Sequence, residues 1–337
     1  MAYSPINISN NAGTRGDPSA MALALKLFSG TVLTSFDRKN IALETVTTKT
    51  IENGKSFQFP VIARSLDNGD TIDTHTPGTD LTVNQIPVKE RIINVDTLQY
   101  YSLALNKFEE KIMHFETRSE LAKQAGEALS NQIDTRVFST VLTATQTSGT
   151  IDGSVMQPDG TEVNNDVIFS GATSEAKGDA LLETLYSAQA VMDGKDITGE
   201  KIFITTPANY NFLVQSGKAI HRDYTSGNGD IAKGTIIEIA GVKIKWSNNL
   251  PITRTATQDT ADSNTETGVD VAGTDKQFQG LLYTPACVGV VKLMDITSEA
   301  NYLPKELNTL LTSYYSYGMG VLNPGAACVI TGGNQVA

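Results

Sequence analysis

The feature that most constrains this chain is an alternating apolar pattern that runs out, turns and returns early in the sequence. Phe57 and Phe59 alternate with polar residues, which is typical of a half-buried strand. Turn-forming residues fill 65–85, and alternating apolar positions resume over 86–98. A lone two-stranded arm of this kind is marginal in water because it cannot bury one face by itself. We therefore expect an arm that requires a partner surface.

Two later segments have the periodicity of amphipathic helices. Residues 117–143 carry an apolar stripe at every fourth position, with charged residues such as Asp134 away from it. Residues 178–193 form a second apolar face, with Asp179 as the expected N-cap and Gly194 placed to end the helix. Strands are expected over 201–205, over 236–246 and in several parts of 278–330. The chain is therefore predicted to have an α+β fold.

The charge balance excludes some partners. The chain has 26 Lys and Arg against 37 Asp and Glu, a net charge of −11. A dedicated nucleic-acid-binding protein needs a basic face, so this charge balance argues against such a protein. It allows a wall that encloses nucleic acid without binding it tightly. Residues 1–20 lack the basic and apolar regions of a signal peptide. We therefore expect neither secretion nor a membrane partner.

Known catalytic patterns are absent from the sequence. Gly54–Ser56 resembles the end of a phosphate-binding loop, but Lys49 stands where that loop needs glycine. The histidines have no companion at metal-ligand spacing: they are His75, His114 and His221. Cys287 and Cys328 are predicted to be buried thiols. We expect no catalytic, cofactor or metal site.

Several segments form a pattern in colinear order: FSGTVLTSF at 28–36, GKSFQFPVIAR at 54–64, TPGTDL at 76–81, IINVD at 92–96, FETRSE at 115–120 and QAGEAL at 124–129. In this order they resemble the major capsid proteins of T7-like short-tailed phages. The likeness continues at 179–191, 203–210, 239–242 and 288–293, and in YSYGMGVLNP at 315–324. It covers about 28–331, except for two loops at 144–175 and 252–277 that do not align.

The resemblance implies the HK97-like capsid fold, whose parts correspond to the segments above. They would be an N-terminal arm (1–50), an extended E-loop (51–98), a peripheral (P) domain (99–177) with a spine helix (117–143), an axial (A) domain (178–285), and strands returning to the P domain (286–337). Hinges are expected near Gly54 and Gly126. The E-loop would be the arm that requires a partner surface.

The implied function is structural. The subunit would assemble, with a scaffolding protein, as hexamers and pentamers into an icosahedral shell around double-stranded phage DNA. A portal would occupy one vertex, and assembly would take place in the cytoplasm of the host bacterium. The expected contacts between subunits involve Lys55, Phe57, Phe59 and Arg64 of the E-loop and Glu116 and Glu120 at the start of the spine helix. Among these, Lys55 and Arg64 would meet the two glutamates of an adjacent subunit.

Three alternatives remain open from sequence alone. An encapsulin-like nanocompartment shell shares the fold and differs in its contents. An extracellular β-rich adhesion protein is suggested by Arg15–Asp17, an Arg-Gly-Asp triplet, but the missing signal peptide argues against it. The third alternative is an α+β enzyme. A hydrolytic turnover that a single point substitution abolishes would be the evidence for it.

Overall fold

The computed structural model describes residues 28–36, 39–63, 77–78, 80, 86–96, 98–106, 117–165, 173–216, 229–230, 235–236, 238–251, 277–303, 306 and 308–332. The chain divides into two compact units. Unit 1 comprises Met1–Asn40, Asp96–Gln132 and Met294–Tyr317, and unit 2 comprises Ile41–Val95, Ile133–Leu293 and Gly318–Ala337. Each unit is thus built from segments that are distant in sequence.

A six-stranded mixed sheet forms the centre of unit 2, in the order β11-β12-β8-β13-β16-β7. Its strands are β7 (Thr161–Asn165), β8 (Lys201–Thr205), β11 (Glu238–Ile239), β12 (Val242–Trp246), β13 (Gln277–Tyr283) and β16 (Ala327–Gly332). Strand β8 pairs parallel with β12 and antiparallel with β13, and β16 pairs antiparallel with β13 and parallel with β7. All residues of β8 and β16 are buried, as expected for inner strands covered on both faces.

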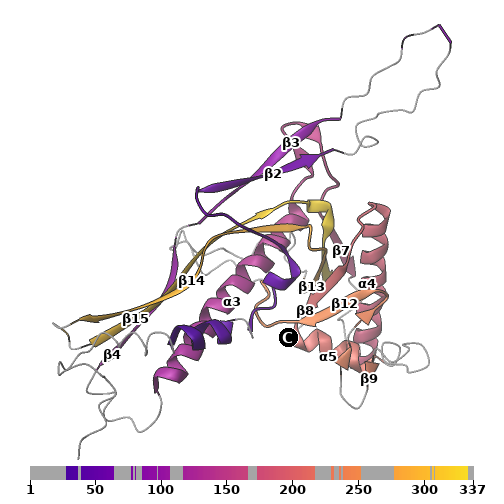
Figure 1. Cartoon of the computed structure of the whole chain (residues 1–337). Helices are drawn as coiled ribbons and strands as arrows, with labels where there is room; N and C mark the ends of the chain where they lie inside the picture. Colours follow the sequence, from indigo (N-terminus) through magenta and orange to yellow (C-terminus); the bar gives the residue numbers. More distant parts are fainter. Residues whose placement is uncertain are drawn as a thin grey trace, which may run out of the picture. The chain divides into compact units, whose positions relative to one another are not determined.

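Helices α4 (Ser174–Gly194) and α5 (Pro207–Gln215) cover one face of this sheet, the face away from the C-terminal half of α3 (Figure 1). Their buried side chains join those of the sheet in one core that includes Leu181, Leu185 and Phe203. Helix α4 ends at Gly194 as predicted, but its N-cap is Thr173, not Asp179. The difference arises because polar residues before 178 form one more helical turn, which leaves Asp179 to accept a hydrogen bond from Ser216 at 2.6 Å.

Helix α3 (Thr117–Gln146) is the long helix expected from the sequence, and it ends three residues later than predicted. At 1.5 Å per residue it is about 45 Å long. The predicted stripe is buried at Ala125, Leu129, Ile133, Val137 and Val141. Asp134, predicted to lie away from the stripe, is fully buried.

A second, four-stranded sheet has the order β1-β14-β15-β4. Its strands are β1 (Thr47–Thr50), β4 (Gln99–Asn106), β14 (Val288–Leu303) and β15 (Asn308–Val321). The remaining elements are η1 (Leu43–Thr45), β2 (Ser56–Ile62), β3 (Val88–Asn94), β5 (Thr150–Ile151), β6 (Ser154–Val155), β9 (Gly229–Asp230), β10 (Thr235–Ile236) and η3 (Pro324–Ala326). Residues 28–36 are also helical. The β-rich C-terminal region predicted from the sequence is thus confirmed.

Gly126 lies in α3 at a close approach within unit 1. A Cβ atom there would lie 2.5 Å from the carbonyl oxygen of Val32 and 2.8 Å from the Cβ of Ser35. Ser35 also donates a hydrogen bond from its Oγ to the carbonyl oxygen of Lys123 at 2.9 Å. The position near which the sequence predicts a hinge thus packs closely against residues 28–36.

Replacing Gly126 with alanine should therefore destabilise the protein by about 1–3 kcal/mol, because backbone atoms must move to admit the new methyl group. Gly30 is the matched control, since nothing lies within 4 Å of the position of its Cβ. Gly30→Ala should stabilise by about 0.5–1 kcal/mol through helix propensity alone. Chemical denaturation of both variants measures the difference, and equal effects of the two substitutions would contradict the close packing.

The two cysteines are buried thiols, as predicted. Burial raises the pKa of Cys287 strongly and raises the pKa of Cys328 to about 12. Because the thiolate is the reactive form, native protein at pH 8 should react with a thiol reagent at least about 100-fold more slowly than unfolded protein. A colorimetric thiol assay with and without denaturant checks this. Fast reaction of either thiol in folded protein would contradict the burial.

Candidate subunit-contact site

Strands β2 and β3 form a two-stranded ribbon, the arm predicted from the sequence (Figure 1). They pair antiparallel from Ser56 opposite Asn94 to Ile62 opposite Val88. The returning strand predicted over 86–98 is shorter than expected and ends at Asn94. The chain then starts a separate strand, β4, at Gln99.

One face of the ribbon, its inner face, packs against the same chain. Phe57 and Phe59 are half-buried against a cluster around Ile93 and Val291. Their ring centroids lie 4.8 Å apart in an edge-to-face arrangement. The Nζ atom of Lys49 lies 5.8 Å from the centroid of Phe57. This face therefore has an apolar covering without any second molecule.

The end of the ribbon at Ile62 and Val88 packs against the β5–β6 hairpin. Val61 and Ala63 form a small buried cluster with Met156. Lys89 and Asp152 add an ion pair with an Nζ–Oδ2 distance of 3.6 Å. The segment after α3, whose sequence did not align with the capsid family, thus supports the ribbon.

Arg91 lies between these two contacts on the inner face, opposite Phe59. Its Nε and Nη2 atoms are buried and have no hydrogen-bond partner among the described residues. Burial lowers the pKa of this guanidinium. The inner face thus holds a cation at a cost in desolvation.

The six residues predicted for subunit contacts comprise two exposed charged residues, two half-buried aromatic residues and two residues that the structure does not describe. Lys55 is exposed and follows Gly54, which has a φ of +108° at the start of the ribbon. Glu120 is exposed and pairs with Lys123 of its own helix at 3.5 Å. Phe57 and Phe59 are the two that the structure brings together. The remaining two, Arg64 and Glu116, lie outside the described residues.

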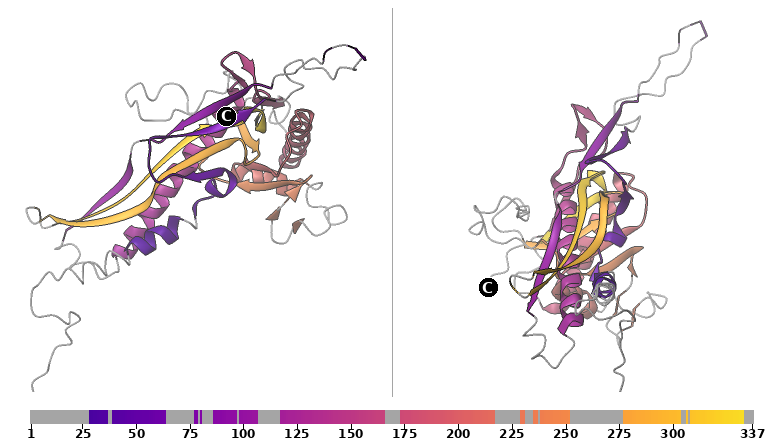
Figure 2. Two further views of the ribbon diagram at one scale, coloured as in Figure 1. Left: turned by 45° about the horizontal axis from the view of Figure 1, so that its top comes forward. Right: turned by 60° about the vertical axis from the view of Figure 1, so that its left-hand side comes forward.

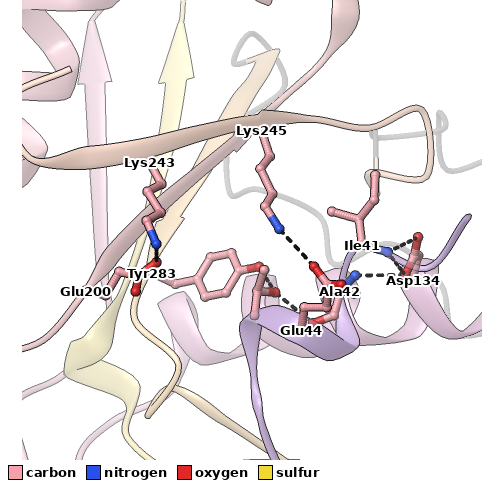
Figure 3. Close-up of polar contacts among 9 residues, drawn as sticks. Ile41, Ala42, Glu44, Asp134, Glu200, Lys243, Lys245 and Tyr283 are labelled. Carbon is pink, nitrogen blue, oxygen red and sulfur yellow. Dashed lines mark hydrogen bonds and ion pairs between the residues drawn. The ribbon is translucent and has the colours of Figure 1, made fainter. Parts of the chain in front are cut away.

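A second polar site in unit 2 was not predicted from the sequence. The Asp134 carboxylate accepts hydrogen bonds from the backbone N–H of Ala42 at 3.0 Å and of Ile41 at 3.3 Å (Figure 3). The side-chain amide of Asn249 donates a third, at 3.5 Å. We call this arrangement the Asp134 clasp. It ties the segment before η1 to α3 and to the loop after β12.

Burial raises the pKa of Asp134, although the hydrogen bonds from Ala42, Ile41 and Asn249 act in the opposite direction. The adjacent Lys245 also favours the carboxylate, and its Nζ lies 3.5 Å from an oxygen of Glu44 (Figure 3). The buried hydroxyls of Thr45 and Tyr283 are 2.6 Å apart. Polar contacts therefore hold residues 41–45 at several points.

Comparison with known proteins identifies the family. The family described as Gp10A-like major capsid protein matches residues 58–331. The chain belongs to this family. The match covers most of the chain, including Asp134, Asn249 and all of the ribbon except Ser56 and Phe57.

Individual capsid proteins agree with this assignment. The major capsid protein of Enterobacteria phage T3 is 27% identical over 96% of this chain and 95% of its own length. The capsid of cyanophage P-SCSP1u is similar in structure, with a TM-score of 0.71 and 30% identity over 88% of this chain and 89% of that one. The capsid of bacteriophage PhiM1 has a TM-score of 0.69 at 19% identity, over 87% of both chains.

This Gp10A-like protein therefore has the HK97-like fold and is a structural subunit that assembles into a phage capsid shell. The expected fold and the expected role as a capsid shell subunit are confirmed, and the family favours a virion shell over a nanocompartment or an adhesion protein. No helix in the described ranges is long and apolar enough to cross a membrane. Those ranges also contain no group of three or more His, Cys, Asp or Glu residues that could hold a metal ion.

A second stripe on α3 could have revealed the clasp. Ser130, Asp134, Phe138 and Leu142 recur at every fourth position, and all four are fully buried. The first stripe alone places Asp134 off the apolar face. Two adjacent stripes indicate a helix buried over a wide arc, where a carboxylate requires hydrogen-bond donors.

Proposed function

We propose that this capsid subunit assembles, with a scaffolding protein, as hexamers and pentamers into an icosahedral shell around double-stranded phage DNA. A portal occupies one vertex, and assembly takes place in the cytoplasm of the host bacterium. The family match over residues 58–331 is the observation that carries this proposal. The chain has a structural role and no catalytic one.

We assign the parts of the chain as the family resemblance implies. The N-terminal arm is 1–50, the E-loop is 51–98, the P domain is 99–177 with 286–337 returning to it, and the A domain is 178–285. The ribbon of β2 and β3 supports the E-loop assignment, because it is a two-stranded arm at the expected place in the sequence. The length of α3 supports its assignment as the spine helix.

The net charge of −11 fits a shell that encloses DNA. A wall without a general excess of cations releases few counterions and so binds the phosphate backbone weakly. The packaged DNA then stays free to leave the shell. Sequence-specific contacts with DNA are not part of this proposal.

Electrostatic contacts across subunits are proposed for the E-loop. Lys55 and Arg64 face Glu116 and Glu120 of an adjacent subunit, while Phe57 and Phe59 hold the ribbon against its own chain. Exposed ion pairs are individually weak, but a closed shell repeats each contact many times.

Lys55→Glu should therefore reduce the yield of particles several-fold, and Glu120→Lys in the same chain should restore it. Lys177→Glu on α4 is the control that makes the same change of charge away from the E-loop. Particle yield and salt resistance are measured by sedimentation. Normal assembly of the Lys55→Glu, Arg64→Glu double variant would refute this contact.

The proposed function itself is tested by expressing the chain with and without its scaffolding protein. Size-exclusion chromatography and negative-stain electron microscopy should then show closed polyhedral particles when the scaffold is present. A monomer or dimer under both conditions would overturn the proposal.

A further inference from the structure

The short link between β1 and β2 contains an asparagine followed by a glycine, Asn53–Gly54. The link is anchored at both ends by backbone hydrogen bonds. At its start, Ile51 donates its N–H to the carbonyl oxygen of Lys292 at 2.9 Å. At its end, Val95 donates its N–H to the carbonyl oxygen of Lys55 at 2.7 Å. The fold therefore fixes where the link begins and where it ends.

The backbone between these two anchors is open. Residues 52–54 are all exposed, and Gly54 has a φ of +108°. Neither the side chain of Asn53 nor the N–H of Gly54 has a hydrogen bond to another described residue. The nearest atom to a Cβ placed at Gly54 would be the carbonyl oxygen of Ser56, 3.9 Å away. The amide of Asn53 and the N–H of Gly54 can thus approach each other without breaking a contact of the fold.

We propose that Asn53 is a site of spontaneous deamidation, with the nitrogen of Gly54 as the attacking atom. A base in the solvent removes the proton from the Gly54 N–H, and the nitrogen forms a bond to Cγ of Asn53. The bond from Cγ to Nδ2 breaks, and Nδ2 takes a proton from water and leaves as ammonia. The five-membered succinimide adds water at either carbonyl and opens to aspartate or isoaspartate. The net reaction consumes water and releases ammonia, with no oxidation or reduction.

The fold protects comparable positions elsewhere in the chain. Asn94 is exposed, but the N–H of Val95, which follows it, is engaged at the second anchor of the link. In Asp159–Gly160, the N–H of Gly160 donates to the carbonyl oxygen of Thr147 at 3.1 Å. An N–H that already donates a hydrogen bond must lose that bond before its nitrogen can attack. The structure therefore selects Asn53 over these positions.

The reaction would change the start of the ribbon. Each event replaces a neutral amide with a carboxylate two residues before Lys55. Isoaspartate also routes the main chain through the former side chain, which adds one bond between the two anchors of the link. Chains that have reacted therefore differ from unreacted chains in charge and in backbone length at this point. The inference concerns the chain itself and does not depend on the proposed function.

The first test follows the reaction by peptide mapping. Purified subunit is incubated at pH 8 and physiological temperature, digested and analysed by mass spectrometry, with aspartate and isoaspartate products separated by chromatography. Asn53 should convert at least about tenfold faster than Asn94, because only its attacking N–H is free. The other Asn-Gly pairs, at 68–69 and 228–229, are in separate stretches of sequence and are scored on their own. Equal rates at Asn53 and Asn94 would overturn the inference.

Asn53→Gln is the matched control. The glutamine keeps the amide at an exposed position, but its extra methylene requires a six-membered ring for the same attack. Conversion at position 53 should therefore fall at least about tenfold. An undiminished rate in Asn53→Gln would mean that water hydrolyses the amide directly, and it would overturn the role of the Gly54 nitrogen.

The second test compares the folded protein with the same protein unfolded in urea. The rates at Asn53 should agree within about threefold, because the fold holds neither reacting group. A rate at least about tenfold lower in the folded protein would show that the link is restrained, and it would overturn the inference. Both tests use subunits, so a failure to form particles would count against the proposed function and not against this reaction.

Discussion

Replacing Asp134 with alanine should lower the free energy of unfolding by about 3–5 kcal/mol, because one buried donor and two partly buried donors lose their acceptor together. The backbone N–H groups of Ile41 and Ala42 and the amide of Asn249 all donate to this carboxylate. Each buried group left unsatisfied costs about 1–3 kcal/mol. Urea denaturation of the purified subunit measures the loss, and a change below about 1 kcal/mol would show that the clasp contributes little.

Asp134→Asn is the matched control, and it separates hydrogen bonding from charge. Asparagine keeps one acceptor oxygen of the same shape, so it should cost less than alanine. Burial raises the pKa of Asp134 in the folded state, so the folded protein takes up this proton at a higher pH than the unfolded chain does. The stability of wild type relative to Asp134→Asn should therefore increase as pH falls from 7 toward 4, and a decrease would contradict the raised pKa.

Phe203→Ala should have a comparably large effect, about 3–5 kcal/mol, because it removes a fully buried ring from the central strand β8. The ring also fills the space next to Gly280 on β13. A Cβ atom at Gly280 would lie 2.5 Å from a ring carbon of Phe203 and 2.9 Å from the carbonyl oxygen of Ile204. The ring and the glycine are therefore expected to be energetically coupled.

A double-mutant cycle measures this coupling. Gly280→Ala alone should cost about 1–3 kcal/mol through overpacking. In the Phe203→Ala background the ring is absent and only the contact with Ile204 remains, so the same change should cost at least about 0.5 kcal/mol less. Strict additivity of the two substitutions would mean that the ring does not restrict position 280. Thermal and urea unfolding of the four proteins provide the data.

Local patterns account for the elements that the sequence predicted well. Alternation around Phe57 and Phe59 predicted the first strand of the ribbon, and the apolar stripe predicted α3. Both patterns arise from residues that are near one another in the sequence. Strand β7 (Thr161–Asn165) was missed because its residues other than Val163 are polar and it lies at the edge of a sheet. It is held by pairing with β16, which lies far away in the sequence.

The candidate site was predictable only in part, for the same physical reason. A sequence shows that the ribbon has an apolar face, but the identity of its covering depends on contacts with residues such as Met156 and Val291. Likewise, Asp134 meets Asn249 only through the tertiary fold. Residue spacing carries information about faces, and it carries little about which distant segment lies against each face.

The place of β16 in the sheet has a consequence for biosynthesis. This strand is the last one among the described residues, yet it lies between β13 and β7 in the six-stranded sheet. The ribosome must therefore reach Gly332 before the sheet can be completed. A prematurely terminated chain lacks an inner strand and exposes the edges of two others. The order of the strands thus makes translation through Gly332 a condition for forming a subunit that can enter the shell.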